Sequence, residues 1–333
     1  MKSMGRDFAR TLPAAVRAEK HLLPASVRAE VEALNGARPL AFSLQLLGAW
    51  TVIIATIVFA IRVESVWVSM VALLIVATRQ NVLGLLVHEQ AHLLGYRGRF
   101  GDLLVNLLAA YPLVVLTVEG YAQVHLAHHR EYFTDGDPDF RRKSGPDWKI
   151  PMSRRTLVKL MLSDLVGINT LKLVRGKRAD EESPLFARRH RYPRWIRPLY
   201  FAVVASLLTL TGTWGVFLLY WLLPILTITQ VIIRWGALCE HKYNLPGATV
   251  AASTPLILPT WWERLLLPNL NFTMHPYHHY FPGISFSKLP MVHSVFDREG
   301  LVDRRCLFDG YLSFLSFITK PAADESSAVD THP

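Results

Sequence analysis

Two stretches of this 333-residue chain carry no charged side chain and are long enough to cross a lipid bilayer. Residues 39–61 form a stretch of 23 residues, and residues 198–233 form another of 36. A helix needs about 20 mostly apolar residues to span the hydrocarbon core, so the second stretch is too long for one crossing. Thr211, Gly212 and Thr213 interrupt it, which predicts two helices joined by a short turn.

A further apolar stretch begins at Ser65 and continues past Arg79 to residue 87. Arg79, Gln80 and Asn81 must then face protein or water. Residues 103–118 are uncharged but short and contain Pro112, which favours an interfacial segment over a crossing. We therefore expect an all-α integral membrane fold with a cytoplasmic helical cap and four transmembrane helices in two hairpins, at residues 39–61, 65–87, 198–212 and 214–234.

The distribution of charge predicts the orientation of these helices. The chain has 36 Lys and Arg against 26 Asp and Glu, a formal charge of +10. Residues 119–197 hold 17 of the basic residues, and residues 1–38 hold seven. Because basic segments stay on the cytoplasmic side, both termini and the long middle segment are predicted to be cytoplasmic. The net positive charge then marks the cytoplasmic face of a multi-pass membrane protein and does not indicate a nucleic-acid partner. We expect the membrane to be a bacterial inner membrane.

The expected organisation has three parts. Residues 1–38 form a cytoplasmic N-terminal segment without the apolar core of a cleavable signal peptide. Residues 39–295 form the membrane domain. Residues 296–333 form a cytoplasmic C-terminal segment, and its Ala-, Ser- and Asp-rich end from residue 321 is predicted to be disordered.

Eight of the 13 histidines fall in three short clusters. The first cluster is an HxxxH pattern and the other two are HxxHH patterns. A ninth histidine, His241, stands between the second and third clusters. In order, the clusters contain His88 and His92; His125, His128 and His129; and His275, His278 and His279.

This spacing has a physical meaning. Residues i, i+3 and i+4 share one face of a helix, so each cluster can present its imidazoles in one direction. Neutral imidazole is a ligand for zinc, copper, nickel and iron. Eight or nine such ligands exceed what one first-row ion accepts, so the pattern predicts two metal ions. With only two cysteines in the chain, histidine must supply the ligands.

A competing motif overlaps the first cluster. His88, Glu89 and His92 form HExxH, the pattern of a zinc protease in which the glutamate is the general base. Such a protease would leave both HxxHH clusters unexplained. A non-catalytic metal transporter is a second alternative, although the histidines lie outside the predicted crossings and not on a midplane ion path.

With its three clusters and four predicted crossings, the chain resembles the membrane fatty acid desaturase superfamily over roughly residues 40–295. Residues 125–140, HLAHHREYFTDGDPDF, are similar to the second histidine box of the bacterial branch that includes β-carotene ketolases. Residues 271–290, NFTMHPYHHYFPGISFSKLP, are similar to the third box and its extension.

The resemblance implies a non-haem di-iron enzyme that uses O2 and removes hydrogen from an unactivated C–H bond. The eight clustered histidines are then the iron ligands, and His241 matches a ninth ligand of the acyl-CoA branch. That branch has a wider first box and an Asn where this chain has Ala237, so an acyl lipid, a sphingolipid or a carotenoid is favoured over an acyl-CoA. The electron donor is expected to be a separate protein of the ferredoxin, rubredoxin or cytochrome b5 type.

The resemblance leaves the reaction open. We expect a desaturase that introduces a double bond into a lipid acyl chain. A hydroxylase or ketolase of a lipid or carotenoid on the same scaffold is the main alternative, and desaturation of an amino-acid-derived natural product is another.

Further residues are candidates for supporting the ligands, because a metal-bound imidazole usually gives its other N–H to a carboxylate or carbonyl. The carboxylates at residues 135–139 could instead lie on an exposed turn fixed by Pro138. Asn271 could instead cap the helix that carries the third cluster. The candidates are Glu89, Asp135, Asp137, Asp139, Glu240 and Asn271.

Overall fold

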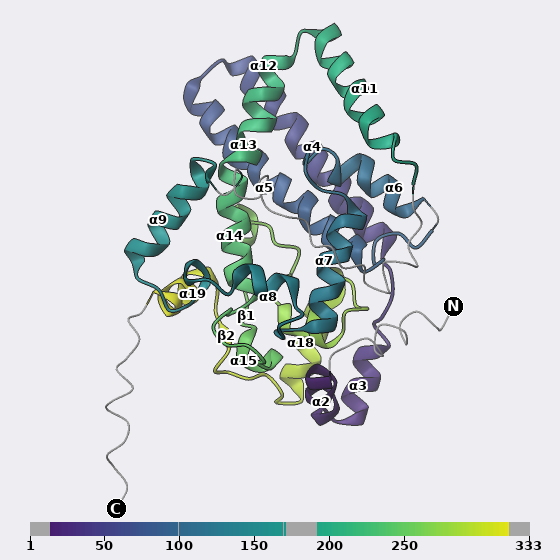
Figure 1. Ribbon diagram of the computed structural model, residues 1–333, viewed down its shortest axis with the longest axis vertical. Coiled ribbons are helices and arrows are strands. Elements are labelled where there is room, and N and C mark those ends of the chain that lie inside the picture. Colours follow the sequence, from purple (N-terminus) through teal and green to yellow (C-terminus); the bar gives the residue numbers. More distant parts are fainter. Residues whose placement is uncertain (1–13, 99, 169, 171–191, 320–333) are drawn as a thin grey trace, which may run out of the picture.

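The computed structural model describes residues 14–98, 100–168, 170 and 192–319. Long apolar helices occupy one half of the described structure, and short helices with two short strands occupy the other half (Figure 1). The predicted disordered tail from residue 321 lies outside the described residues.

Three described helical segments are long and apolar enough to cross a membrane. They are α4 (Pro39–Val63), α5 (Val66–Ala91) and the compound segment Trp214–Glu240. The fourth expected crossing corresponds to α11 (Ile196–Thr211), which has 16 residues. At 1.5 Å per residue it is about 24 Å long, shorter than the hydrocarbon core of about 30 Å. Three of the four expected crossings are therefore present as long apolar helices among the described residues, and the fourth, a shorter apolar helix, stays a prediction.

The two predicted turns between apolar helices are present. Glu64 ends α4 in a left-handed conformation, with φ of 52°. Gly212 ends α11 with φ of 65°, a conformation that glycine adopts without steric cost. The compound segment then begins at Trp214, as expected from the sequence.

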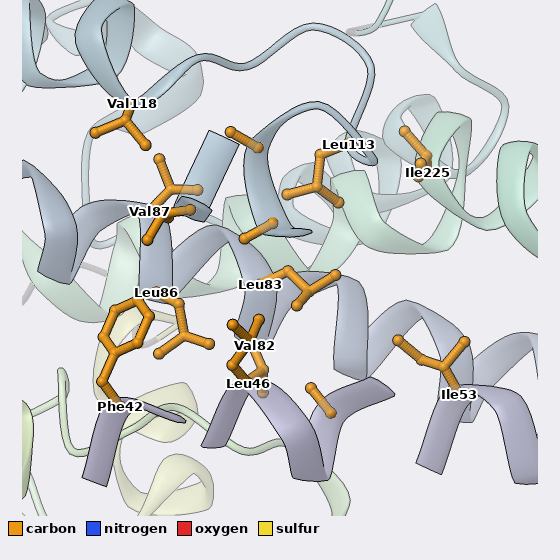
Figure 2. Packing of buried hydrophobic residues seen from close by; sticks show 14 of the residues in the cluster. Phe42, Leu46, Ile53, Val82, Leu83, Leu86, Val87, Leu113, Val118 and Ile225 are labelled. Carbon is orange, nitrogen blue, oxygen red and sulfur yellow. The ribbon is translucent and has the colours of Figure 1, made fainter. Parts of the chain in front are cut away.

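The largest hydrophobic core lies where α4 and α5 pack together (Figure 2). Phe42, Leu46 and Ile53 face α5 from one side, and Leu83 and Leu86 meet them from α5. All five side chains are buried, and each removes apolar surface from solvent at about 25 cal/mol per Å². This packing fixes the end of α5 that carries the first histidine cluster.

The third long segment is interrupted twice. A π-helical turn and a break at Thr227, which has φ of −128° and ψ of −90°, divide it. Gln80, buried in α5, compensates for the first irregularity, because it donates to the Trp221 carbonyl at 2.9 Å and accepts from the Thr229 hydroxyl at 2.7 Å. Gln80 therefore faces protein, as a polar side chain in the middle of a predicted crossing must. The parts are α12 (Trp214–Phe217), η4 (Leu218–Leu222), α13 (Leu223–Leu226) and α14 (Ile228–Glu240).

The segment expected at the interface, residues 103–118, forms most of α6 (Gly101–Val105) and η1 (Asn106–Ala110), followed by a loop. Val105 and Ala109 are buried in the core beside α5, whereas Leu108 is exposed. The segment therefore packs one face against protein and presents the other outward.

Most of the remaining elements gather around the histidine-bearing ends of α5 and α14, whereas α9 extends along α14 (Figure 1). The strands β1 (Leu256–Ile257) and β2 (Leu307–Phe308) pair in parallel. Near the chain ends, α2 (Ala14–Leu22) and α3 (Ala25–Glu32) contact α17 and α18. The other helices are α7 (Val118–Glu131), α8 (Pro138–Lys143), η2 (Pro146–Trp148), α9 (Arg154–Leu165), α15 (Val250–Ser253), α16 (Trp261–Leu266), α17 (His275–Tyr280), η5 (Phe286–Lys288), α18 (Leu289–Arg298) and α19 (Tyr311–Ile318).

Candidate metal centre

The first histidine cluster occupies the last turn of α5. His88 lies inside the helix, and His92 is the residue at which the helix ends. Both side chains are buried, with exposed fractions of 4% and 2%. Their spacing of four residues places them on one face, as the sequence pattern predicts.

The second cluster lies in the last two turns of α7, and the beginning of this helix is fixed by two polar residues. The Thr117 hydroxyl accepts a hydrogen bond from Gly120 N at 2.9 Å, which caps the helix. Asn106 accepts from Val118 N at 2.8 Å and donates to Glu119. These contacts satisfy helix-terminal N–H groups that otherwise lack partners, and they set the position of the second cluster.

His241 and the third cluster come from two separate elements. α14 ends at Glu240, and His241 follows it in an extended conformation with φ of −145°. The third cluster forms most of α17, with His275 as its first residue and Pro276 immediately after it. Proline is favoured in the first turn of a helix because its missing N–H has no partner there in any case.

The Nε2 atoms of these histidines converge in two groups. In the first, His125 Nε2 lies 2.8 Å from His92 Nε2, and His129 Nε2 lies 3.0 Å from His278 Nε2. In the second, His241 Nε2 lies 3.2 Å from the Nε2 atoms of His128, His275 and His279. The first group consists of His88, His92, His125, His129 and His278, and the second of His128, His241, His275 and His279.

These separations fit metal coordination. Two imidazole nitrogens bound at about 2.1 Å to one ion, at right angles, are about 3.0 Å apart. His241, His275 and His279 form a triangle of Nε2 atoms with each side 3.2 Å. One N–H can point to only one neighbour, so hydrogen bonds alone would leave lone pairs facing each other in this triangle. A cation at its centre removes that repulsion.

His88 gives independent support for a ligand role. Both of its ring nitrogens are buried without a hydrogen-bond partner. Leaving a buried polar group unsatisfied costs about 1–3 kcal/mol. Its ring centroid lies 4.2 Å from that of His125 and 4.7 Å from that of His278, both in the first group. A metal ion bound by this group would satisfy one of these two nitrogens.

The electrostatic environment keeps these rings neutral. Burial, together with neighbouring imidazoles, holds the pKa values of His129, His241 and His279 well below the usual value of 6.5. Burial first, and His128 second, lower the pKa of His278 to about 3. A neutral imidazole has the free lone pair that a metal requires, so the donor set suits a pair of divalent cations.

Of the carboxylates proposed to support the ligands, Asp137 makes the closest contact. His128 Nδ1 donates to Asp137 Oδ2 at 2.8 Å, which fixes the proton on Nδ1 and leaves Nε2 as the ligand atom. Asp137 also accepts from Phe133 N at 2.9 Å and from Asp139 N and Phe140 N at the start of α8. Phe133 has a left-handed conformation, with φ of 56°, and this turn brings Asp137 back beneath His128.

Two neighbouring carboxylates are placed differently. Asp135 is exposed on the turn, as the alternative interpretation of this segment expects. Asp139 accepts from Lys143 Nζ and from the Tyr243 hydroxyl, each at 2.9 Å. Although burial alone raises the pKa of Asp139, Lys143 and Arg142 hold it well below its usual range. Asp139 therefore serves an ion pair and not a histidine.

The other three candidates lie at the edges of the centre. Glu89 accepts from Phe286 N at 3.3 Å and so ties α5 to the segment after the third cluster. Glu240 ends α14 and interacts electrostatically with Lys143. Asn271 accepts from Arg264 at 2.9 Å and donates to the Phe286 carbonyl, and the residue before α17 is Met274, so Asn271 does not cap this helix.

The sequence did not indicate one further support of the centre. The Thr254 hydroxyl lies 3.3 Å from His241 Nδ1 and 2.7 Å from the Tyr132 hydroxyl, which in turn lies 2.6 Å from Ser253 Oγ. All three hydroxyl residues are buried. They belong to segments 122 positions apart and have no characteristic spacing, so only the tertiary contacts reveal them.

Comparison with known protein families agrees with this geometry. The fatty acid desaturase family model matches residues 65–308, which is well over half of the chain and includes all nine histidines of the two groups. A comparison with curated proteins gave no match. The family match, the membrane-spanning helices and the two histidine groups together show that the chain is a membrane protein that belongs to the fatty acid desaturase family.

Proposed function

We propose that this protein is an O2-dependent di-iron desaturase that introduces a double bond into an acyl chain of a membrane lipid. The observation that carries the proposal is the convergence of nine imidazoles into two groups beside the ends of two membrane-spanning segments. Nitrogen ligands without thiolates suit iron, and the family match supports oxidoreductase chemistry.

The position of the two groups supports a lipid substrate. His88 lies in the last turn of the membrane-spanning helix α5, and His241 follows the last residue of α14. An acyl chain in the adjacent leaflet is therefore close to both groups without leaving the bilayer. This placement favours a substrate that is delivered from the membrane over one that arrives through water.

The proposed ligands are His88, His92, His125, His129 and His278 for one iron and His128, His241, His275 and His279 for the other. When bound, the iron pair would supply O2 activation and removal of hydrogen from an unactivated C–H bond. Asp137 holds a proton on His128 Nδ1, and Thr254 contacts His241 Nδ1, so both imidazoles keep Nε2 directed into the second group. Burial of the surrounding side chains excludes bulk water from this space.

The proposed reaction needs an external reductant. Forming one carbon–carbon double bond removes two hydrogen atoms from the substrate, and O2 leaves as two molecules of water. The balance requires two further electrons and two protons, which a separate carrier of the ferredoxin, rubredoxin or cytochrome b5 type would provide.

The orientation is also part of the proposal. The described chain ends, α2 with α3 and α19, lie in the half that holds the short helices and the two strands (Figure 1), and α2 contacts the histidine-bearing helix α17. The basic middle segment of the sequence supports a cytoplasmic location for this side, and we propose that the membrane is a bacterial inner membrane. Both termini and the metal centre then face the compartment that holds soluble electron carriers.

Metal analysis combined with lipid profiling tests the proposal. Cells would express the wild type, His128→Ala, or Asp135→Asn as a control on the exposed turn. We expect purified wild type and the control to contain two irons and to produce an unsaturated acyl chain. His128→Ala should lose iron and leave the lipid profile as in cells without the protein.

Three outcomes would contradict the proposal. One zinc and no iron in the wild type would favour the HExxH protease. Hydroxylated product without alkene would identify a hydroxylase on the same scaffold. An unchanged lipid profile with fully iron-loaded wild type and an active electron donor would exclude a membrane lipid as the substrate.

A further inference from the structure

Helix α9 carries an apolar stripe that no part of the described structure covers. Val158, Leu162, Leu165 and Val166 are 54%, 55%, 41% and 69% exposed. Positions separated by four, seven and eight residues share one face of a helix. The opposite face is buried, with Leu157 in a core cluster and Asp164 fully inaccessible.

The residues that follow the end of α9 at Leu165 reach a point midway along a membrane-spanning segment. Thr170 Oγ1 donates to the Leu226 carbonyl at 3.2 Å, and Gly167 approaches the same carbonyl closely. Leu226 follows Trp214 by 12 residues and precedes Glu240 by 14. At 1.5 Å per residue, this carbonyl lies about 20 Å from the histidine-bearing end of the segment.

The contact with Thr170 has a physical reason. The break at Thr227 turns Gln230 N toward the Thr227 carbonyl, at 3.0 Å, and away from Leu226. A carbonyl without a partner inside the hydrocarbon core costs several kcal/mol, because no water is present to bind it. The Thr170 hydroxyl supplies the missing donor.

An ion pair connects α9 to the same segment nearer to the histidines. Arg234 donates to both carboxylate oxygens of Asp164, and the side chains are 4% and 0% exposed. Ionisable residues within a membrane are tolerated when they pair with each other. Arg154, Arg155 and Lys159 lie in the first turns of α9, at the end where the charged headgroups of a leaflet would be.

We propose that α9 is inserted obliquely into the leaflet on the histidine side, as a half-span, and that lipid acyl chains cover its apolar stripe. The sequence alone placed this helix in an aqueous cytoplasmic segment because of its basic residues. The depth of Leu226 argues otherwise, because a helix that starts at the leaflet surface and is followed within five residues by a contact to this carbonyl must run into the hydrocarbon between them. This inference depends on the membrane-spanning segment and not on the proposed reaction.

A spin-label depth series tests the insertion. In a Cys306→Ser background the remaining native cysteine, Cys239, is buried and shielded from the label. Cysteine would replace Arg155, Val158, Leu162 and Val166 one at a time, each variant followed by nitroxide labelling. The labelled full-length protein would be reconstituted in phosphatidylcholine–phosphatidylglycerol vesicles. The ratio of nitroxide collisions with O2 to those with a water-soluble nickel chelate increases with depth in a bilayer. We expect this ratio to rise stepwise from Arg155 to Val166, by several-fold in total.

Two reference positions calibrate the series. A label at Leu47, which is 65% exposed on the membrane-spanning helix α4, reports the lipid environment. A label at Asp135 on the exposed turn reports water. All labelled positions are exposed, and serine at position 306 keeps a donor for the Ala251 carbonyl, so the variants should fold; matching elution with wild type on gel filtration checks this.

Each result decides the matter. A stepwise rise to the value at Leu47 supports the half-span. Equal ratios at Val158, Leu162 and Val166 would mean a helix lying flat on the surface, and ratios like that at Asp135 would mean an aqueous helix. Low collision rates with both reagents would mean coverage by protein, such as a second copy of the chain. Any of the last three would overturn the proposal.

Discussion

His128 Nδ1 and Asp137 Oδ2 are 2.8 Å apart, and the two side chains are 3% and 0% exposed. A carboxylate can only accept in this contact, so the imidazole must carry its proton on Nδ1. The ligand atom Nε2 is thereby directed toward His241 Nε2, 3.2 Å away. Asp137, in the turn after α7, therefore determines how the imidazole of His128, a proposed iron ligand, is oriented.

Replacing this carboxylate should weaken metal binding. We expect Asp137→Asn to lower iron affinity by about 10- to 100-fold, the usual cost of losing a partner of a metal-bound histidine. Competition with a chelator, followed by metal analysis, measures the change. Asp135→Asn, on the exposed turn, is the matched control and should bind iron as the wild type does. Equal affinities for all three proteins would exclude an orienting role for Asp137.

Removal of His241 should empty one of the two proposed iron positions. Its Nε2 is 3.2 Å from three other imidazole Nε2 atoms, whereas the first group does not include it. We expect purified His241→Ala to retain about one iron instead of two, since the five histidines of the first group remain. His293→Ala is the control, because His293 bonds to Tyr277 outside both groups. Retention of two irons in His241→Ala would show that His241 is not a ligand.

The Thr254 hydroxyl should contribute to both stability and metal binding. Thr254→Val keeps the shape of the side chain but leaves His241 Nδ1 without its contact, and Tyr132 keeps only Ser253. We expect the free energy of unfolding to fall by about 1–3 kcal/mol, the cost of an unsatisfied buried polar group. Thermal unfolding measures this loss, and chelator competition should show faster release of one iron. Thr254→Ser keeps the hydroxyl and should behave like the wild type.

The stability of the metal-free protein should depend steeply on pH below 6.5. Burial lowers the pKa values of His129, His241 and His279, and that of His278 to about 3, whereas each titrates near 6.5 in the unfolded chain. As the pH falls below 6.5, the unfolded state takes up protons that the folded state does not, so the free energy of unfolding decreases. The stabilisation is fully present above this range.

Denaturation of chelator-treated protein between pH 8 and pH 5 checks this expectation. His278→Gln removes one such group and should reduce the steepness of the decrease. A stability that is constant over this range would mean that these imidazoles bind protons equally in the folded and unfolded states, with pKa values near 6.5 in both.

Removing one partner of the buried pair Arg234 and Asp164 should lower the free energy of unfolding strongly, whereas replacing both by apolar residues should lower it little. Asp164→Asn leaves the Arg234 charge without its carboxylate, and we expect a loss of about 3–5 kcal/mol in unfolding free energy. The double variant Asp164→Leu with Arg234→Met removes both charges and should recover most of this loss. Thermal unfolding in detergent measures both. A double variant as unstable as Asp164→Asn would show that the pair has a role other than mutual neutralisation.

Much of this protein follows directly from its sequence. The uncharged stretches predict long apolar helices, because a helix that crosses hydrocarbon needs about 20 apolar residues. Gly212 predicts the turn after α11, where φ is 65°. The spacing of the histidines predicts which of them share a helix face, and their number predicts more than one metal ion. These features are local, so the order of residues is sufficient to determine them.

The tertiary structure decided how the histidines divide. Each HxxHH cluster contributes to both groups: His128 lies opposite His125 and His129, and His278 lies opposite His275 and His279. It also places His241 in the second group. Of the three aspartates in the turn after α7, only Asp137 contacts a clustered histidine, and Thr254 contacts His241 from a distant segment. The tertiary structure packed α9 against α14 and brought Thr170, five residues after the end of α9, to the Leu226 carbonyl in the middle of a membrane-spanning segment. The reason is the same in each case: these contacts join segments distant in the chain, and their geometry depends on how α5, α7, α14 and α17 pack together.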